Sequence, residues 1–198
     1  MRLNIEGLAC RRGERVLFDG LSFAAEAGDA VVVTGPNGAG KTSLIRLIAG
    51  LTPPQAGAVV VDGAPLARES LHLIGHLDAV KGALTVKENL AFSRALLGGR
   101  IAGETALEAL GLAALSELPA RVLSAGQKRR LALARLLVAE RPLWLLDEPT
   151  ASLDADGQAR LAAIVAAHRA KNGIVVAATH AALDFPGARE VRLGGAPA

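Results

Sequence analysis

The sequence predicts an α/β fold built on a mainly parallel sheet. Short, continuously apolar runs occur at 31–33, 143–146 and 174–178, as in strands that are buried on both faces. Stretches with helical spacing alternate with these runs, at 41–49, 127–139 and 155–169. Strands that alternate with helices favour a parallel sheet covered by helices.

The first third of the chain and its middle differ in character. Further short strands are predicted at 3–8, 16–18, 22–25, 30–34 and 57–61. The first helix is predicted to end at Gly50, ahead of Pro53 and Pro54. From about 67 to 123 the chain is rich in Leu, Ala and Glu, which predicts a mainly helical insertion.

Composition limits the class of protein. The 198 residues are 51% apolar and 21% charged, enough for one well-packed domain. Mean hydropathy is high at +0.35, yet no uncharged apolar run approaches the ~18 residues of a spanning helix. Glu6 interrupts any signal-like apolar stretch, and the single Cys10 excludes an internal disulfide, so we expect a cytosolic chain.

The charge pattern argues against a nucleic-acid partner. The net charge is only +3, and the densest basic cluster, 128–130, has three members. Aromatic residues make up 3% of the chain and there is no Tyr, which leaves little material for base stacking. The sequence therefore predicts no nucleic-acid-binding face.

The strongest motif is a glycine-rich loop between the buried strand at 30–34 and the helix that follows. It fits the pattern G-x-x-x-x-G-K-[ST], in which backbone N–H groups surround phosphate oxygens at a helix start. We expect it to bind a nucleoside triphosphate, with Lys41 at the β- and γ-phosphates and Thr42 on Mg²⁺. The expected nucleotide-binding residues here are Gly35, Pro36, Asn37, Gly38, Ala39, Gly40, Lys41, Thr42 and Ser43.

Two carboxylates follow the apolar run at 143–146. Ligands of parallel sheets sit beyond the carboxyl ends of the strands, so Asp147 and Glu148 are expected beside the phosphate loop. Asp147 is suited to Mg²⁺, and Glu148 could polarise a water toward the γ-phosphate.

Further motifs resemble those of ATP-binding cassette (ABC) proteins, in the right order along the chain. The signature motif is similar to Ser124-Ala125-Gly126-Gln127, which also reads simply as a helix cap. The second nucleotide motif resembles 145–150, the D-loop resembles Ser152-Leu153-Asp154, and the switch histidine resembles His180. The resemblance implies a single ABC domain over 1–198, with an antiparallel β subdomain and a small helical subdomain inserted at about 76–125.

The resemblance also implies roles. Two cassettes would pair head-to-tail, so that ATP on one copy meets Ser124, Ala125, Gly126 and Gln127 of the other. Glu148 would be the general base, Lys41 and His180 would act at the γ-phosphate, and Asp154 would link the two sites. ATP and Mg²⁺ are the implied cofactors, with Thr42 and Asp147 at the metal.

Departures from the usual pattern narrow the family. His76 stands where most cassettes have a Mg²⁺-sensing glutamine, and is a further metal candidate. Arg12, or Arg11, replaces the aromatic residue that stacks on adenine. With the short chain and the segments 8–18, 74–76 and 84–89, the sequence resembles the haem-exporter ATPase of bacterial cytochrome c maturation.

That resemblance implies a peripheral subunit at the cytoplasmic face of the bacterial inner membrane. Its partners would be a second copy and the integral permease subunits of a haem exporter. A transport ATPase for another cargo is the alternative, because a cassette alone does not touch cargo.

Overall fold

The computed structural model describes residues 1–180, 183 and 185–194, and it confirms the predicted α/β fold class. The larger sheet has five strands in the order β6-β7-β8-β3-β9, and every pair in it is parallel. These strands are β3 (Ala30–Thr34), β6 (Leu71–Ile74), β7 (Leu143–Asp147), β8 (Ile174–Ala178) and β9 (Arg189–Arg192).

The smaller sheet is antiparallel, with four strands in the order β2-β1-β4-β5. Its strands are β1 (Arg2–Arg12), β2 (Arg15–Glu26), β4 (Ala56–Val61) and β5 (Ala64–Pro65). Leu3, Ile5 and Leu8 of β1 are buried in one apolar cluster with Leu44 and Ile48 of the first helix. The antiparallel sheet is therefore joined to the rest of the protein through that helix.

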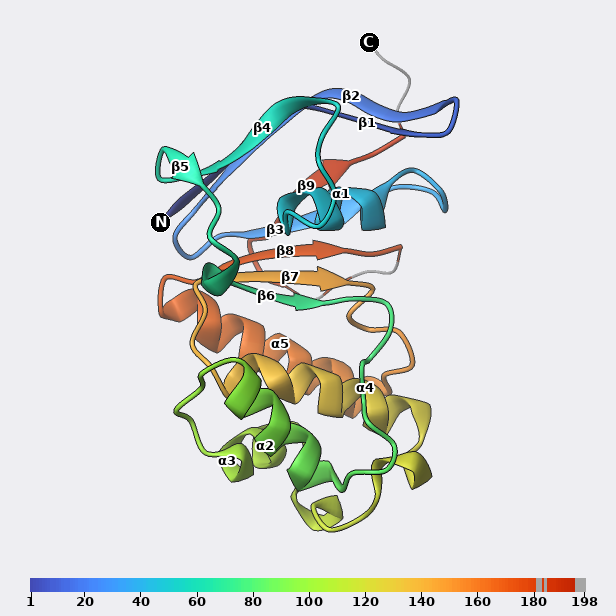
Figure 1. Ribbon diagram of the computed structural model, residues 1–198, viewed down its shortest axis with the longest axis vertical. Coiled ribbons are helices and arrows are strands. Elements are labelled where there is room, and N and C mark those ends of the chain that lie inside the picture. Colours follow the sequence, from blue (N-terminus) through green and yellow to red (C-terminus); the bar gives the residue numbers. More distant parts are fainter. Residues whose placement is uncertain (181–182, 184, 195–198) are drawn as a thin grey trace.

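The helices form layers around the parallel sheet (Figure 1). They are α1 (Lys41–Ile48), α2 (Val86–Leu96), α3 (Gly103–Ala109), α4 (Ala125–Ala134) and α5 (Ala155–Ala170). Helix α1 lies between the two sheets, α4 and α5 cover the opposite face of the parallel sheet, and α2 and α3 lie beyond α4. The predicted helical character of the middle segment thus appears as a separate layer.

The parallel sheet is buried on both faces, as its continuous apolar strands predict. Successive residues of a strand point to opposite faces. Val31 and Val33 of β3 accordingly pack with α1, whereas Val32 packs in the other cluster with Leu131 of α4 and Leu161 of α5. One sheet thus serves two separate cores.

Two predictions about elements were wrong, the bounds of a third differ, and one strand was missed. The strands expected at 16–18 and 22–25 are one strand, β2, which continues through register shifts opposite β1. The segment expected to be helical from about 67 begins with a single 3₁₀ turn at Arg68–Ser70 and then forms β6. The helix expected at 127–139 begins at Ala125 and tightens into a 3₁₀ turn at Arg135–Leu137. Strand β9 was not predicted, because three of its four residues are charged and it lies at the sheet edge.

Within the described part of the chain, no helix has both the length and the apolar character needed to cross a membrane.

A buried histidine ties β6 to the segment after α4. His72 lies beside Trp144 in the sheet register, and its Nε2–H donates to the carbonyl of Ala139 at 2.7 Å. Burial lowers the pKa of His72 to about 4, and the charges of Arg141 and Arg135 act in the same direction against the Ala139 hydrogen bond. Burial also lowers the pKa of His168, which stacks on Trp144, to about 4.

These histidines predict an acid-sensitive fold. Below pH 6.5 these histidines bind protons in the unfolded chain but stay neutral in the folded protein. Their contribution to the free energy of unfolding is therefore fully present above pH 6.5 and is lost as the pH falls toward 4. For His72 we expect a loss of about 2 kcal/mol in the free energy of unfolding between pH 7.5 and 5. Urea unfolding at both pH values measures it.

The control is a pair of variants. His72→Gln removes one of the two titrating groups and should weaken the dependence of stability on pH by about half, and adding His168→Gln should remove most of the rest. Equal pH dependence in the parent and in His72→Gln would contradict the assignment.

Candidate nucleotide-binding site

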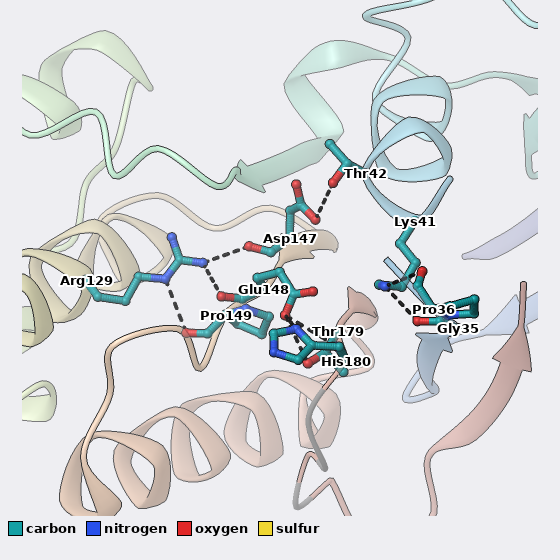
Figure 2. Close-up of polar contacts among 10 residues, drawn as sticks. All are labelled: Gly35, Pro36, Lys41, Thr42, Arg129, Asp147, Glu148, Pro149, Thr179 and His180. Atoms are coloured by element: carbon teal, nitrogen blue, oxygen red, sulfur yellow. Dashed lines mark hydrogen bonds and ion pairs between the residues drawn. The ribbon is translucent and has the colours of Figure 1, made fainter. Parts of the chain in front are cut away.

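The phosphate loop, Asp147, Glu148 and His180 meet at one edge of the parallel sheet. Strands β7, β8 and β3 are neighbours, and the segments that follow their carboxyl ends carry the phosphate loop, the two carboxylates and His180. Figure 2 shows Lys41, Thr42, Asp147, Glu148 and His180 gathered at this edge. Residues far apart in the sequence thus share one site, as the parallel fold predicts.

The phosphate loop joins β3 to α1 and depends on glycine at both ends. Gly35 has φ 139°, and a Cβ there would lie 2.4 Å from the Leu193 carbonyl oxygen. Gly40 caps α1 in the left-handed region, with φ 101°, and a Cβ there would press on Phe18. Between them Pro36, Asn37 and Gly38 are exposed and Ala39 is buried.

Lys41 lies against this loop instead of extending into solvent. The side chain is only 7% exposed, and its ammonium donates to the carbonyls of Gly35 at 2.8 Å and Pro36 at 3.2 Å. Ser43, in the first turn of α1, is half-buried and forms a side-chain hydrogen bond with Cys10. The helix thus begins with a cation held at the loop.

Thr42 and Asp147 form the second part of the site. The Thr42 hydroxyl donates to Asp147 Oδ1 at 3.1 Å, and Asp147 is 3% exposed. Burial raises the pKa of Asp147, and the hydrogen bond from Thr42 opposes the shift. A hydroxyl and a carboxylate that already touch are hard oxygen donors of the kind that Mg²⁺ prefers.

Glu148 stands in an unusual backbone conformation, with φ 49°. Its N–H donates to the Ala178 carbonyl at 2.8 Å, which fixes it to the end of β8. One carboxylate oxygen, Oε2, lies 2.9 Å from His180 Nδ1 and accepts a hydrogen bond from the Thr179 hydroxyl at 3.3 Å. The His180 side chain is 64% exposed and that of Glu148 is 17% exposed, so the histidine faces outward and the carboxylate lies deeper.

The signature residues lie at the start of α4. The Ser124 hydroxyl accepts from the Gln127 N–H at 3.2 Å, and the Gln127 side chain accepts from the Ser124 N–H at 2.8 Å, so the two form a reciprocal helix cap. Ala125 is exposed. A Cβ on Gly126 would lie 2.7 Å from the Ser152 carbonyl oxygen, so only glycine permits this contact with the D-loop.

Asp154 caps α5. Its carboxylate accepts from the Gly157 N–H at 2.8 Å. Asp154 therefore acts as the N-cap of α5, as its position just before the helix favours.

His76 and Arg12, the two residues that depart from the usual ABC pattern, are both exposed. His76 is exposed on the loop after β6, and its charge acts to lower the pKa of Asp147, which places it near that carboxylate. Among the described residues, no group of three or more His, Cys, Asp or Glu side chains is arranged to hold a metal. Arg12 is exposed at the end of β1.

Sequence reasoning missed two arginines at the site. Arg15, opposite Arg12 in the hairpin, reaches the phosphate loop, and a Cβ on Gly38 would lie 3.6 Å from its guanidinium. Arg129 belongs to the basic cluster at 128–130 but is 2% exposed. It shares a helical face with Ala132, Leu133 and Leu136, all buried, and this spacing was the available signal.

Comparisons with known proteins agree with this geometry. The family model described as ABC transporter matches residues 18–151. A cytochrome c biogenesis ATP-binding export protein, CcmA, of Nitrobacter winogradskyi is 55% identical over 99% of this chain and all of its own length. The protein of that name from Rhodopseudomonas palustris is 53% identical over the same shares of the two chains.

A solved structure from Pyrococcus furiosus, described as an ATP-binding protein of an ABC transporter, has a TM-score of 0.88. It is 23% identical over 98% of both chains, which supports the fold alone. The family match and the full-length relatives go further: the chain belongs to the ABC transporter family, in the group of cytochrome c biogenesis ATP-binding export proteins.

Proposed function

We propose that this chain is the ATP-hydrolysing subunit of an ABC export complex that handles haem during c-type cytochrome biogenesis. The observation that carries the proposal is the pairing of a phosphate loop with Asp147, Glu148 and His180, in a chain 55% identical over its full length to an export protein of cytochrome c biogenesis. Haem as cargo follows from that relative's role, because c-type cytochromes carry covalent haem.

ATP would bind at the loop from Gly35 to Ser43. Its backbone N–H groups and the amino end of α1 favour phosphate, and Lys41 supplies a positive charge. Thr42 and Asp147 would hold Mg²⁺, which neutralises phosphate charge when bound. His76 is a further candidate at the metal, and Arg12 is the candidate for the adenine base, with Arg15 beside the loop.

Glu148 is the proposed general base. Its carboxylate would take a proton from the water that attacks the γ-phosphate, while His180 contacts that phosphate. The contact of 2.9 Å between His180 Nδ1 and Glu148 Oε2 supports this, because a positioned base and its partner must lie within hydrogen-bond reach. Positioning and charge stabilisation then supply most of the rate.

The site would be completed by a second copy. Ser124, Ala125, Gly126 and Gln127 would contact the ATP of the other cassette, and Asp154 would link the two sites. The closeness of Gly126 to Ser152 supports this link, because it places the start of the signature helix against the segment that carries Asp154.

We further propose one ABC domain over 1–198, with its helical subdomain inserted at about 76–125. Integral permease subunits would be its partners, and the cytoplasmic face of the bacterial inner membrane its place. Nucleic acid is not among the proposed partners. Exposed apolar side chains of the insertion support docking on a partner. These side chains are Leu77, Phe92, Leu96, Leu118 and Val122.

Glu148→Gln should abolish turnover and leave ATP binding intact. Loss of the proton acceptor should lower kcat by about 100-fold or more, since general base catalysis contributes about 10²–10⁴-fold. Phosphate release and nucleotide binding by the purified full chain measure the two effects. Glu140→Gln, at an exposed glutamate away from the site, is the matched control, and full activity in Glu148→Gln would reject the base role.

Deletion of this gene should remove covalent haem from c-type cytochromes. Haem-stained gels of membrane and periplasmic fractions measure it, and the parent gene should restore the stain where the Glu148→Gln gene does not. Normal c-type cytochromes in the deletion strain would reject haem handling and favour the alternative, an ABC transport ATPase for another cargo.

A further inference from the structure

One buried cation, the Arg129 guanidinium, contacts both the end of β7 and the loop that follows β6. The Arg129 guanidinium donates to three successive backbone carbonyls where β7 ends: those of Asp147 at 2.8 Å, Glu148 at 2.7 Å and Pro149 at 3.3 Å. The same guanidinium donates from its other terminal nitrogen to the Gly75 carbonyl and to Asp78, each at 2.9 Å (Figure 2 shows the carbonyl side). All five guanidinium contacts are to parts of the site or its adjoining loop.

The carbonyl contacts bear on the conformation of Glu148. Its φ of 49° lies in the left-handed region, which costs free energy for a residue with a side chain and persists only where the surroundings fix it. The Ala178 carbonyl fixes the Glu148 N–H, and Arg129 fixes the Glu148 carbonyl. Arg129 therefore holds the peptide on one side of the residue, and β8 holds the peptide on the other.

The remaining contacts hold the loop that carries His76. Asp78 pairs with Arg129 through its carboxylate, and its own carbonyl accepts from Arg135 at 3.1 Å. Both arginines belong to α4 and the turn that continues it. A displacement of this helix must therefore carry the loop with it or break these bonds.

The geometry needs a guanidinium. Its planar fork reaches five acceptors on two segments at once, whereas a lysine ammonium is a single point with three donors. Because the cation is buried, each lost contact leaves a carbonyl or the charge itself without a partner.

We infer that Arg129 is a positioning residue for hydrolysis: it fixes the backbone of Glu148 and holds the 75–78 loop against α4, the helix capped by Ser124. This rests on the proposed role of Glu148. A movement of α4 when two copies close would then shift the backbone of Glu148, the proposed general base, through the Arg129 side chain.

The test compares Arg129→Lys, Asp78→Asn and Arg130→Lys in the purified full chain with Mg²⁺ and ATP. In Arg129→Lys we expect kcat to fall about 10- to 100-fold with KM for ATP within about twofold, since a misplaced group costs rate at unchanged affinity. Asp78→Asn, which removes only the loop-side charge, should lower kcat by a smaller factor. Arg130→Lys is the matched control, because Arg130 contacts Asp156 and the Leu110 carbonyl instead.

A readout apart from activity separates positioning from general stability. Amide hydrogen exchange at Asp147 and Glu148 should speed up in Arg129→Lys and stay at the parent rate in Arg130→Lys. All kinetics are compared at a temperature where each variant is folded by circular dichroism. If Arg129→Lys does not fold, the kcat of Asp78→Asn compared with that of the parent tests the inference.

Parent kcat in folded Arg129→Lys, or in Asp78→Asn when that variant alone is available, would overturn the inference. So would an equal loss of kcat in Arg130→Lys. The Glu148→Gln result is read separately: an inactive Glu148→Gln with a fully active Arg129→Lys keeps the general base and rejects only Arg129 as its positioning residue.

Discussion

The site depends on the parallel pairing of β7, β8 and β3. Hydrogen bonds in register along these three short strands place their carboxyl ends side by side. The phosphate loop, Asp147, Glu148 and His180 lie at or just after these ends. The strands can lie together only because both of their faces are apolar, and the two cores that result are held by α1 on one side and α4 with α5 on the other.

This constraint explains what the sequence could predict. The valine run at 31–33, the apolar run before Asp147 and the strand before Thr179 are all buried on both faces, so their composition alone identifies them. The glycine-rich loop is equally visible, because its glycines are needed for backbone geometry, as at Gly35 and Gly40. The architecture and the approximate location of the site followed from these patterns.

Other features depend on tertiary contacts that leave little trace in local sequence. Strand β9 reads as a charged surface segment, and it becomes a strand because β3 offers it a free edge. Arg129 reads as one of three basic residues, and only the packed structure gives it five acceptors. Arg15 was overlooked because its nearness to Gly38 depends on how the antiparallel sheet packs over α1.

The position of Trp144 makes the protein its own optical reporter. It is the only tryptophan in a chain without tyrosine, so it dominates the near-ultraviolet emission. It lies in β7 three residues before Asp147, is 3% exposed, and stacks on His168 with ring centroids 3.9 Å apart. The emission of unlabelled protein can therefore follow the surroundings of β7, the strand that ends at Asp147.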